Sequence, residues 1–359
     1  MTHGVTRRAA IAAGAATAAV FAVADKASAA PAQAPAQAPA QAPAQAGPAV
    51  QAPGQPPTIE ANGPKRVQRV YDRQKARAGG RWHSHIAALH PDGSATEIVA
   101  DDADFVINGY SVQKLAVTTA VLDKVDRGEL TLGTLTPLTA DIIAGGSGIY
   151  HLHRVYGDQI TVANFLTAML LVSDNTAVRL CGRFVPALEL NEILAAKGFV
   201  HTRVEPVANP NRFFLGVTTP REMHQLLTRL AAKTLLSTSS CDFFLSILRW
   251  INGYNDGVRR EMSSDERSRV ATKYGADFNT LGGSRHEAGI MFGTDGAPVL
   301  TYSMFCDAHP DQNNYGATHP VVQAHSVIGR VLFDTIATAA APSATSHHTV
   351  PKFQPYKGD

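Results

Sequence analysis

The chain has 359 residues, a formal net charge of +2 and three cysteines. This charge balance gives no sign of a nucleic-acid-binding surface, and the cysteines lack the spacing of a metal site. Cys181, Cys241 and Cys306 are compatible with one disulfide or with three small buried hydrophobic residues.

The N-terminus predicts an export signal. Residues 1–29 combine Thr6-Arg7-Arg8, an alanine-rich apolar run and the small-residue site Ala27-Ser28-Ala29. This pattern is typical of a twin-arginine signal. A retained anchor is the alternative, although the run is short for a bilayer span. We therefore expect export to the periplasm or the cell exterior, without stable membrane insertion.

Low-complexity sequence flanks the predicted folded domain. Residues 30–62 repeat a Pro-Ala-Gln-Ala unit and predict a semi-rigid linker, because such a segment favours extended polyproline geometry. Residues 338–359 predict a disordered tail, in which His347-His348 is a solvated pair or a weak metal ligand. The folded domain is therefore expected over residues 63–337.

This domain begins with a helix and a hairpin. Apolar spacing predicts a helix over 64–78, and strands are expected over 82–90 and 96–100 around the Asp92-Gly93 turn. A polar run over 101–109 then leads to Ser111 and an apolar helix that includes residues 115–122.

The middle of the chain predicts helices and the last part predicts strands. Thr161 is expected to cap one helix, Thr219-Pro220-Arg221-Glu222 to form a capping box for another, and residues 243–251 to form a third. A hairpin around Asp295-Gly296 and a closing helix over 321–336 follow. Strands at both ends predict an α/β sandwich whose sheet is built from both termini, with a helical insertion.

Three short motifs carry groups suited to nucleophilic catalysis. Ser111-Val112-Gln113-Lys114 places a hydroxyl and an amine on one helical face, and burial of that helix would make Lys114 a usable base. Ser173-Asp174-Asn175 and Lys273-Tyr274-Gly275 add a second serine and a second lysine. Each motif alone is a weak signal, and their order is that of penicillin-interactive serine enzymes.

Between the last two motifs the chain reads Arg203-Val204-Glu205-Pro206-Val207-Ala208-Asn209. With it, the region from Gly63 to Phe333 resembles class A β-lactamases, which carry an Arg-x-Glu-Pro-x-x-Asn omega loop at this place. The resemblance implies a five-stranded antiparallel sheet with flanking helices and an all-helical subdomain. Nothing indicates an oligomer, so we expect a monomer that acts on a small molecule.

The resemblance also implies the catalytic roles. Ser111 would be the nucleophile, Lys114 would help to take its proton, and Ser173 would pass a proton to the leaving nitrogen. Glu205 and Asn209 would activate the deacylating water, unless Glu205 is a plain surface carboxylate. Whether Lys114 or Glu205 is the acylation base is open.

The remaining implied roles concern binding. The backbone N–H groups of Ser111 and Ala276 would form the oxyanion hole, and Asn175 would hold a substrate amide. Lys273 and Arg285 would bind the substrate carboxylate, and Tyr274 and Gly275 would contact the substrate beside it. No metal or organic cofactor is expected.

Several features depart from the family pattern or lie outside it. Tyr274 replaces a small hydroxyl residue, and no acidic residue follows to pair with Arg203. His151 and His153 predict exposed loop residues, with a metal site as the alternative. His286 and Glu287 are expected either to touch the substrate or to face solvent from an edge strand.

Three functions follow from these patterns. The first is hydrolysis of a β-lactam through an acyl-enzyme on Ser111, with deacylation assisted by Glu205. The second is a D,D-peptidase or esterase-like activity with slow or absent β-lactam turnover. The third, a silent cell-wall-binding module, requires loss of a catalytic residue, whereas Ser111, Lys114, Ser173 and Lys273 are all present.

Overall fold

The computed structural model describes residues 62–337. The predicted signal, nearly all of the linker and the tail fall on residues 1–61 and 338–359, outside the described residues. A five-stranded antiparallel sheet has the order β2-β1-β10-β9-β8. Its strands are β1 (Arg81–Leu89), β2 (Ala95–Asp101), β8 (Val270–Asn279), β9 (Gly282–Phe292) and β10 (Pro298–His309). The prediction of a sheet built from both ends of the domain is therefore confirmed.

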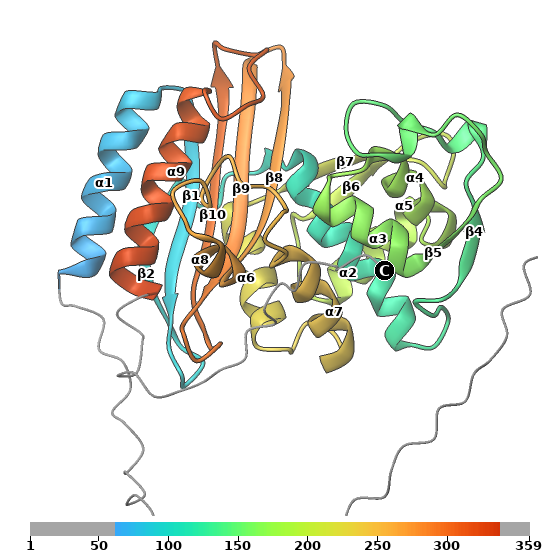
Figure 1. Cartoon of the computed structure of the whole chain (residues 1–359), viewed down its shortest axis with the longest axis horizontal. Helices are drawn as coiled ribbons and strands as arrows, with labels where there is room; N and C mark the ends of the chain where they lie inside the picture. Colours follow the sequence, from blue (N-terminus) through green and yellow to red (C-terminus); the bar gives the residue numbers. More distant parts are fainter. Residues whose placement is uncertain (1–61, 338–359) are drawn as a thin grey trace, which may run out of the picture. The chain divides into compact units, whose positions relative to one another are not determined.

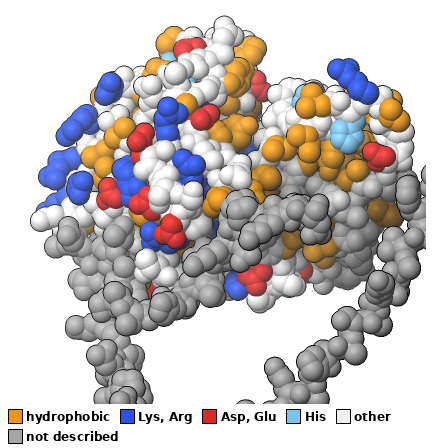
Figure 2. All heavy atoms as spheres, viewed as in Figure 1, with side chains coloured by type: hydrophobic (Ala, Val, Ile, Leu, Met, Phe, Trp, Pro, Cys, Tyr) orange, Lys and Arg blue, Asp and Glu red, His pale blue; other side chains and the backbone are white. Residues whose placement is uncertain are grey.

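One face of this sheet is covered by α1 (Gly63–Ala78) and α9 (Pro320–Leu332), which lie side by side (Figure 1). Tyr71 of α1 and Trp82 of β1 pack edge to face, with ring centroids 5.8 Å apart. This apolar layer places Trp82 and Ile86 on one side of β1, so His85 between them faces the other side. Lys and Arg side chains gather over α1 on the outer surface (Figure 2).

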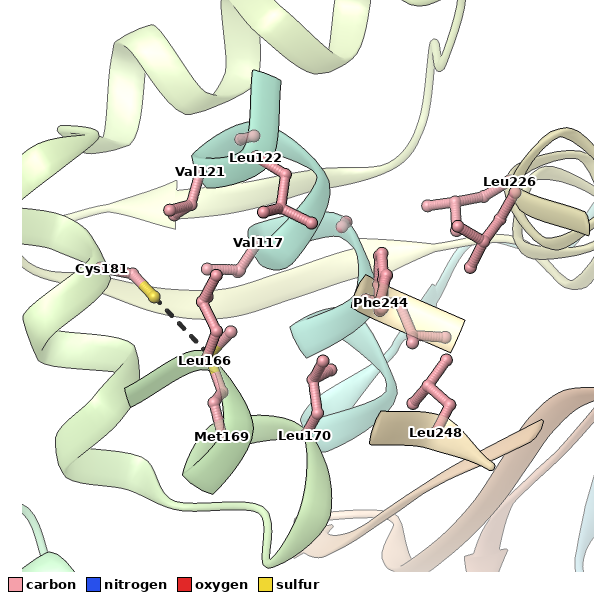
Figure 3. Packing of buried hydrophobic residues seen from close by; sticks show 14 of the residues in the cluster. Val117, Val121, Leu122, Leu166, Met169, Leu170, Cys181, Leu226, Phe244 and Leu248 are labelled. Atoms are coloured by element: carbon pink, nitrogen blue, oxygen red, sulfur yellow. Dashed lines mark hydrogen bonds between the residues drawn. The ribbon is translucent and has the colours of Figure 1, made fainter. Parts of the chain in front are cut away.

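The other face of the sheet carries α6 (Pro220–Ala231), which contacts β1, β9 and β10. Beyond it lies a helical region centred on α2 (Lys114–Asp126), whose first nine residues are buried. Helices that surround α2 are α3 (Val162–Leu171), α4 (Asn175–Phe184), α5 (Ala187–Ala196) and α7 (Thr238–Leu248). Figure 3 shows this core, in which Val117 and Leu122 of α2 lie near Leu166 and Phe244.

The remaining elements are short. They are β3 (Ile107–Asn108), β4 (Leu135–Pro137), β5 (Gln159–Thr161), β6 (Arg203–Pro206), β7 (Phe213–Thr218), α8 (Ser264–Ser268), and the single turns Tyr110–Gln113, Ala140–Ile142, Tyr150–Leu152 and Phe333–Ala337. Strands β3, β7 and β6 form a small second sheet, and β4 pairs with β5. The segment expected as an omega loop is therefore a β6–β7 hairpin.

Two local predictions need correction. The capping box of α6 is only half formed: Thr219 Oγ1 accepts the N–H of Glu222 at 3.0 Å, but the Glu222 carboxylate accepts N–H groups of residues 200–202 instead. Helix α7 begins at Thr238, because Ser237 caps it, and ends at Leu248 rather than at residue 251.

The three cysteines are free and buried, so the hydrophobic interpretation is correct. Cys181 contacts Met169 in the helical core, with the two sulfurs 3.7 Å apart (Figure 3). Within residues 62–337, no helix combines the length and the apolar character needed to cross a membrane.

Candidate active site

Ser111 lies in the 3₁₀ turn Tyr110–Gln113, which leads directly into α2. Tyr110 has a φ of 43°, a left-handed conformation that is strained for a bulky residue. Strand β8 passes close to this turn: a Cβ atom on Gly275 would lie 2.8 Å from Val112 N and 3.0 Å from Ser111 N. Only glycine allows this approach, which places the next residue, Ala276, in the same cavity wall as Ser111.

Two lysines meet at the hydroxyl of Ser173. Lys114 Nζ lies 3.0 Å from Ser173 Oγ, 2.6 Å from the Ser173 carbonyl oxygen and 2.8 Å from Asn175 Oδ1. Lys273 Nζ lies 3.0 Å from the same Ser173 Oγ. The amine of Lys114, which begins α2 directly after the turn that carries Ser111, thus reaches the second serine, Ser173.

Burial changes the proton affinity of both amines. Lys114 is 0% exposed, and this desolvation lowers its pKa to about 7, although Asp174 opposes the shift. Desolvation, followed by the charge of Lys114, holds the pKa of Lys273 well below its usual value. An amine with a pKa near 7 is suited to take a proton from a hydroxyl at neutral pH.

Asp174 fixes the backbone that carries Ser173. Its buried carboxylate caps α4 by accepting the N–H of Ala177 at 2.9 Å, and also accepts the N–H groups of Ile149 and Tyr150. Ser173 itself has a φ of 57°, which these bonds help to hold. Sequence reasoning assigned Asp174 no role, although its place between Ser173 and Asn175 was a usable signal.

A cavity of about 710 Å³ opens in front of these groups. Six of the predicted site residues line it: Ser111, Ser173, Asn175, Glu205, Tyr274 and Ala276. The predicted residues Lys114, Lys273 and Gly275 are buried behind its wall. The motifs that are separated in sequence are therefore brought together around one space.

Glu205 and Asn209 separate in the structure. Glu205 is exposed on β6 and lines the cavity, and the neighbouring N–H of Val204 is held by Asn191 Oδ1 at 2.8 Å. Asn209 lies in the hairpin turn, where its side chain accepts the N–H of Asn211 at 3.0 Å. Asn209 is therefore not among the residues that line the cavity with Glu205, contrary to the expectation that the two residues share a water site.

Arg285 does not serve as a carboxylate ligand. It is 2% exposed, and its guanidinium donates to the backbone carbonyls of Asp277, Ser284, Gln312 and Asn314. The ring of Tyr315 covers it, with the guanidinium carbon 4.4 Å from the ring centroid. Its function in this position is to hold the segment 312–315 against β8 and β9.

His286 and Glu287 are also corrected. They lie on β9, the second strand from the edge, and both are buried. His286 Nε2 donates to the Asn108 carbonyl at 3.0 Å, and Glu287 accepts the hydroxyl of Thr272 at 2.8 Å. Neither of them touches the cavity.

The two loop histidines do not form a metal site with acidic neighbours. His153 is 3.9 Å from Asp158, a long ion pair on the surface. Among residues 62–337, no group of three or more histidine, cysteine, aspartate or glutamate side chains is placed to hold a metal ion.

The cavity also contains residues that no motif indicated. Tyr254 stacks on Tyr274 with ring centroids 4.0 Å apart and an interplanar angle of 18°. Tyr315, Asp256 and Asp277 line the same cavity. They come from segments around α8, β8 and β10, and no sequence pattern links them to the serine motifs.

Comparison with known proteins agrees with this arrangement. The model of the beta-lactamase enzyme family matches residues 65–336. None of the curated protein sequences matches the chain.

Among solved structures, a beta-lactamase from Sphaerobacter thermophilus has 23% identity and a TM-score of 0.60, covering 75% of this chain and 96% of its own. A beta lactamase from Xanthomonas campestris pv. campestris has 20% identity and a TM-score of 0.62, covering 76% and 98%. A point mutant of PBP-A, in an acyl-enzyme complex with penicillin G, has 20% identity and a TM-score of 0.57, covering 78% and 98%. At these identities the likeness shows a shared fold.

Proposed function

Because the chain belongs to the beta-lactamase enzyme family, a family of hydrolases that act on small molecules, we propose that it opens a β-lactam amide through an acyl-enzyme on Ser111. The observation that most supports this proposal is the position of Ser173 Oγ, which lies 3.0 Å from both Lys114 Nζ and Lys273 Nζ at the wall of the cavity that Ser111 lines.

Acylation begins with attack of Ser111 Oγ on the carbonyl carbon of the lactam. The hydroxyl proton passes to neutral Lys114, whose pKa of about 7 leaves a large deprotonated fraction at neutral pH. The oxygen of the tetrahedral intermediate takes the negative charge. The backbone N–H groups of Ser111 in the nucleophile turn and of Ala276 on β8 would stabilise it, and the close approach of β8 to this turn at Gly275 supports that role.

Collapse of the intermediate breaks the C–N bond and requires a proton on the leaving nitrogen. Ser173 can donate its hydroxyl proton there, because its oxygen is itself supplied with hydrogen bonds by two amines. Lys114, protonated in the first step, then returns a proton to Ser173 across the same 3.0 Å contact. The leaving nitrogen thus receives the proton of Ser173, and the proton removed from Ser111 replaces it on Ser173.

Deacylation requires a water molecule and a base. Glu205 is exposed on β6 and faces the cavity. Its carboxylate would take a proton from a water that attacks the ester carbonyl, and Ser111 Oγ would leave with a proton.

A D,D-peptidase or esterase-like activity is the second candidate. It is favoured by one observation: Asn209 is bound within the hairpin turn and does not accompany Glu205 at the cavity. With one residue fewer to place the water, the acyl-enzyme would be longer-lived, and β-lactam turnover would be slow.

One experiment separates the two candidates. The purified protein is incubated with a chromogenic cephalosporin and a penicillin, and intact mass is followed together with turnover. Rapid turnover in the wild type and a trapped adduct in Glu205→Gln support β-lactam hydrolysis. Glu192→Gln, an exposed carboxylate on α5, is the matched control.

A stable adduct on wild-type Ser111 without turnover would favour the peptidase or esterase-like activity. Absence of any adduct, under conditions in which the protein is folded, would overturn the acyl-enzyme proposal altogether.

We also propose that the protein acts after export. The support is the twin-arginine pattern Thr6-Arg7-Arg8 and the site Ala27-Ser28-Ala29. Replacement of Arg7-Arg8 by two lysines should leave the full-length protein in the cytoplasm, as measured by cell fractionation. Unchanged export of that variant would contradict the proposal.

A further inference from the structure

Gln113 links the nucleophile turn, residues 110–113, to the hairpin that carries Glu205. It is the last residue of this turn and is 0% exposed. Its Nε2 donates to two backbone carbonyls, that of Val217 at 2.7 Å and that of Arg203 at 3.2 Å. Arg203 lies on β6, and Val217 is its partner on β7. One side-chain amide therefore bridges both strands of the hairpin at its open end.

A backbone hydrogen bond joins the same two segments. Gly109, directly before the nucleophile turn, donates its N–H to the Gly216 carbonyl at 3.0 Å. A Cβ atom on Gly109 would lie only 2.5 Å from Gln113 Cγ. Because Gly109 has no side chain, Gln113 can pass over it to reach the hairpin. These bonds hold the nucleophile turn and the start of the hairpin together.

The anchored strand pair contains a β-bulge immediately before Glu205. The register shifts between Arg203 and Glu205, so that one residue of β6 lies opposite two residues of β7. One of these two, Gly216, has a φ of 72°, and a Cβ atom on it would overlap the Arg203 carbonyl oxygen. A bulge changes the direction of the side chains next to it. Gln113 therefore binds the backbone at the bend that precedes Glu205, a residue that lines the cavity.

Strand β6 is short and lies at an edge, so its position depends on such anchors. It has four residues and is the outer strand of the sheet β3-β7-β6. On its outer side, Asn191 of α5 binds the N–H and the carbonyl of Val204 at 2.8 and 3.0 Å. Asn191 and Gln113 thus bind the backbone of the two residues that precede Glu205.

The amide of Gln113 also has a cost. Its Oε1 is buried and has no hydrogen-bond partner among the residues that the structure describes. A buried acceptor without a partner lowers stability, and natural proteins accept such costs mainly at functional positions. This points to a role for the two bonds of Nε2 beyond packing.

We propose that Gln113 is a positioning residue for deacylation: its amide fixes β6 against the nucleophile turn, so that Glu205 faces the ester on Ser111. The inference rests on the proposed function, in which Glu205 takes a proton from the attacking water. Such a base must be held to within about 0.5 Å of its productive position. Acylation depends on Ser111 and Lys114, which do not lie on the hairpin, and is therefore less sensitive to Gln113.

The test is Gln113→Met, which keeps the length of the side chain and removes both donors. Acylation of Ser111 by a penicillin and decay of the adduct are measured separately, by intact mass after rapid quenching. We expect deacylation to fall about tenfold and acylation to change by less than about threefold. Thr119→Val is the matched control: it removes a buried hydroxyl that donates to the Leu115 carbonyl on α2, and it should leave both rates unchanged.

A double-variant cycle separates positioning from a general structural effect. In the Glu205→Gln background the base is already absent, so Gln113→Met should cause no further loss of deacylation. A loss of the same size with and without Glu205, or an equal loss in both steps, would overturn the inference.

A second variant covers the case in which Gln113→Met does not fold. Gly109→Ala displaces the Gln113 side chain from the hairpin but leaves its amide in place, and the φ of −79° at Gly109 is one that alanine adopts. This variant should also slow deacylation more than acylation, and an equal effect on both steps contradicts the inference.

The outcomes separate this inference from the acyl-enzyme itself. If the wild type forms an adduct and Glu205→Gln does not slow its decay, the role of Glu205 and this inference fall together, while acylation of Ser111 stands. If the wild type forms no adduct, the proposed function falls, and hydrogen exchange then tests the anchor alone. Faster exchange in residues 203–218 of Gln113→Met, with unchanged exchange in β9, supports the anchor, and unchanged exchange in residues 203–218 contradicts it.

Discussion

Lys114 and Lys273 each place Nζ 3.0 Å from the same oxygen atom, Ser173 Oγ. Both amines are buried. Two ammonium groups this close would repel each other, and desolvation lowers the pKa of both lysines. An arrangement of this kind costs stability unless at least one amine is neutral. It therefore supplies a neutral amine beside the nucleophile turn.

Replacement of Lys114 by arginine tests this base. Since neutral Lys114 accepts the proton, wild-type acylation should rise as pH increases through about 7 and then level off. Lys114→Arg cannot lose its proton, so acylation should fall by about 100-fold or more and lose this rise.

The measurement is the acylation rate from pH 5 to 9, and Lys124→Arg on the same helix, paired with Glu129 and Glu189, is the control. A Lys114→Arg enzyme that keeps most of its rate would assign the base to Glu205.

Ser173 combines a functional hydroxyl with an unfavourable backbone. Its φ of 57° suits glycine better than alanine. Ser173→Gly should therefore be about 1 kcal/mol more stable than Ser173→Ala, while both lose about 100-fold or more of the activity. Urea denaturation and steady-state rates provide the measurements.

Lys233, with a φ of 56° on the surface, is the matched control. Lys233→Gly should likewise be more stable than Lys233→Ala, and both variants should keep the wild-type activity. Equal stability of the two Ser173 variants would show that the backbone there is not strained.

Much of the fold follows from local patterns. The hairpins around Asp92-Gly93 and Asp295-Gly296 are recognisable because short apolar runs flank tight Asp-Gly turns. The start of α7 is not, because Ser237 caps a polar first turn and, apart from Cys241, the apolar residues begin only at Phe243. Periodicity therefore locates the buried part of a helix better than its ends.

In the candidate site, the sequence predicts which side chains lie together when the residues are close in the chain. It does not predict contacts between residues that are far apart in the chain. Ser111 and Lys114 share one turn, and Ser173 and Asn175 share one cap, so their proximity could be predicted. The partners of Arg285 include the carbonyls of Gln312 and Asn314, which become neighbours only after β10 turns back. No spacing rule could show that its guanidinium is already saturated.

Gly275 should be intolerant of any side chain. A methyl group at this position would lie 2.8 Å from Val112 N and 3.0 Å from Ser111 N, both of them backbone atoms that cannot move independently. Gly275→Ala should displace the nucleophile turn, lower acylation at least about tenfold and cost about 1–3 kcal/mol of stability. Gly133→Ala, which has room for a methyl group at a turn away from the cavity, is the control. Equal activity of the two variants would contradict the close approach of β8.

Glu287 is expected to make the stability of the protein depend on pH. It is fully buried, and desolvation raises its pKa from 4.5 to about 7, while Val258 N–H, the Thr272 hydroxyl and the charge of Arg259 oppose the shift. His325 Nδ1 lies 3.7 Å away, but burial lowers the pKa of that histidine to about 3. The histidine is therefore neutral and does not hold the carboxylate in its charged form.

The sign of the effect follows from proton linkage. Between pH 4.5 and about 7 the folded carboxyl keeps a proton that the unfolded chain has released, so stability falls as pH rises through this window. The loss amounts to about 3 kcal/mol above pH 7.

Glu287→Gln removes the titrating group. The free energy of unfolding of this variant minus that of the wild type should therefore be about 2–3 kcal/mol larger at pH 8 than at pH 5. Urea denaturation at both pH values measures this, with Glu192→Gln as the exposed control. Parallel pH dependence in Glu287→Gln and the wild type would mean that Glu287 is ionised in the folded protein throughout.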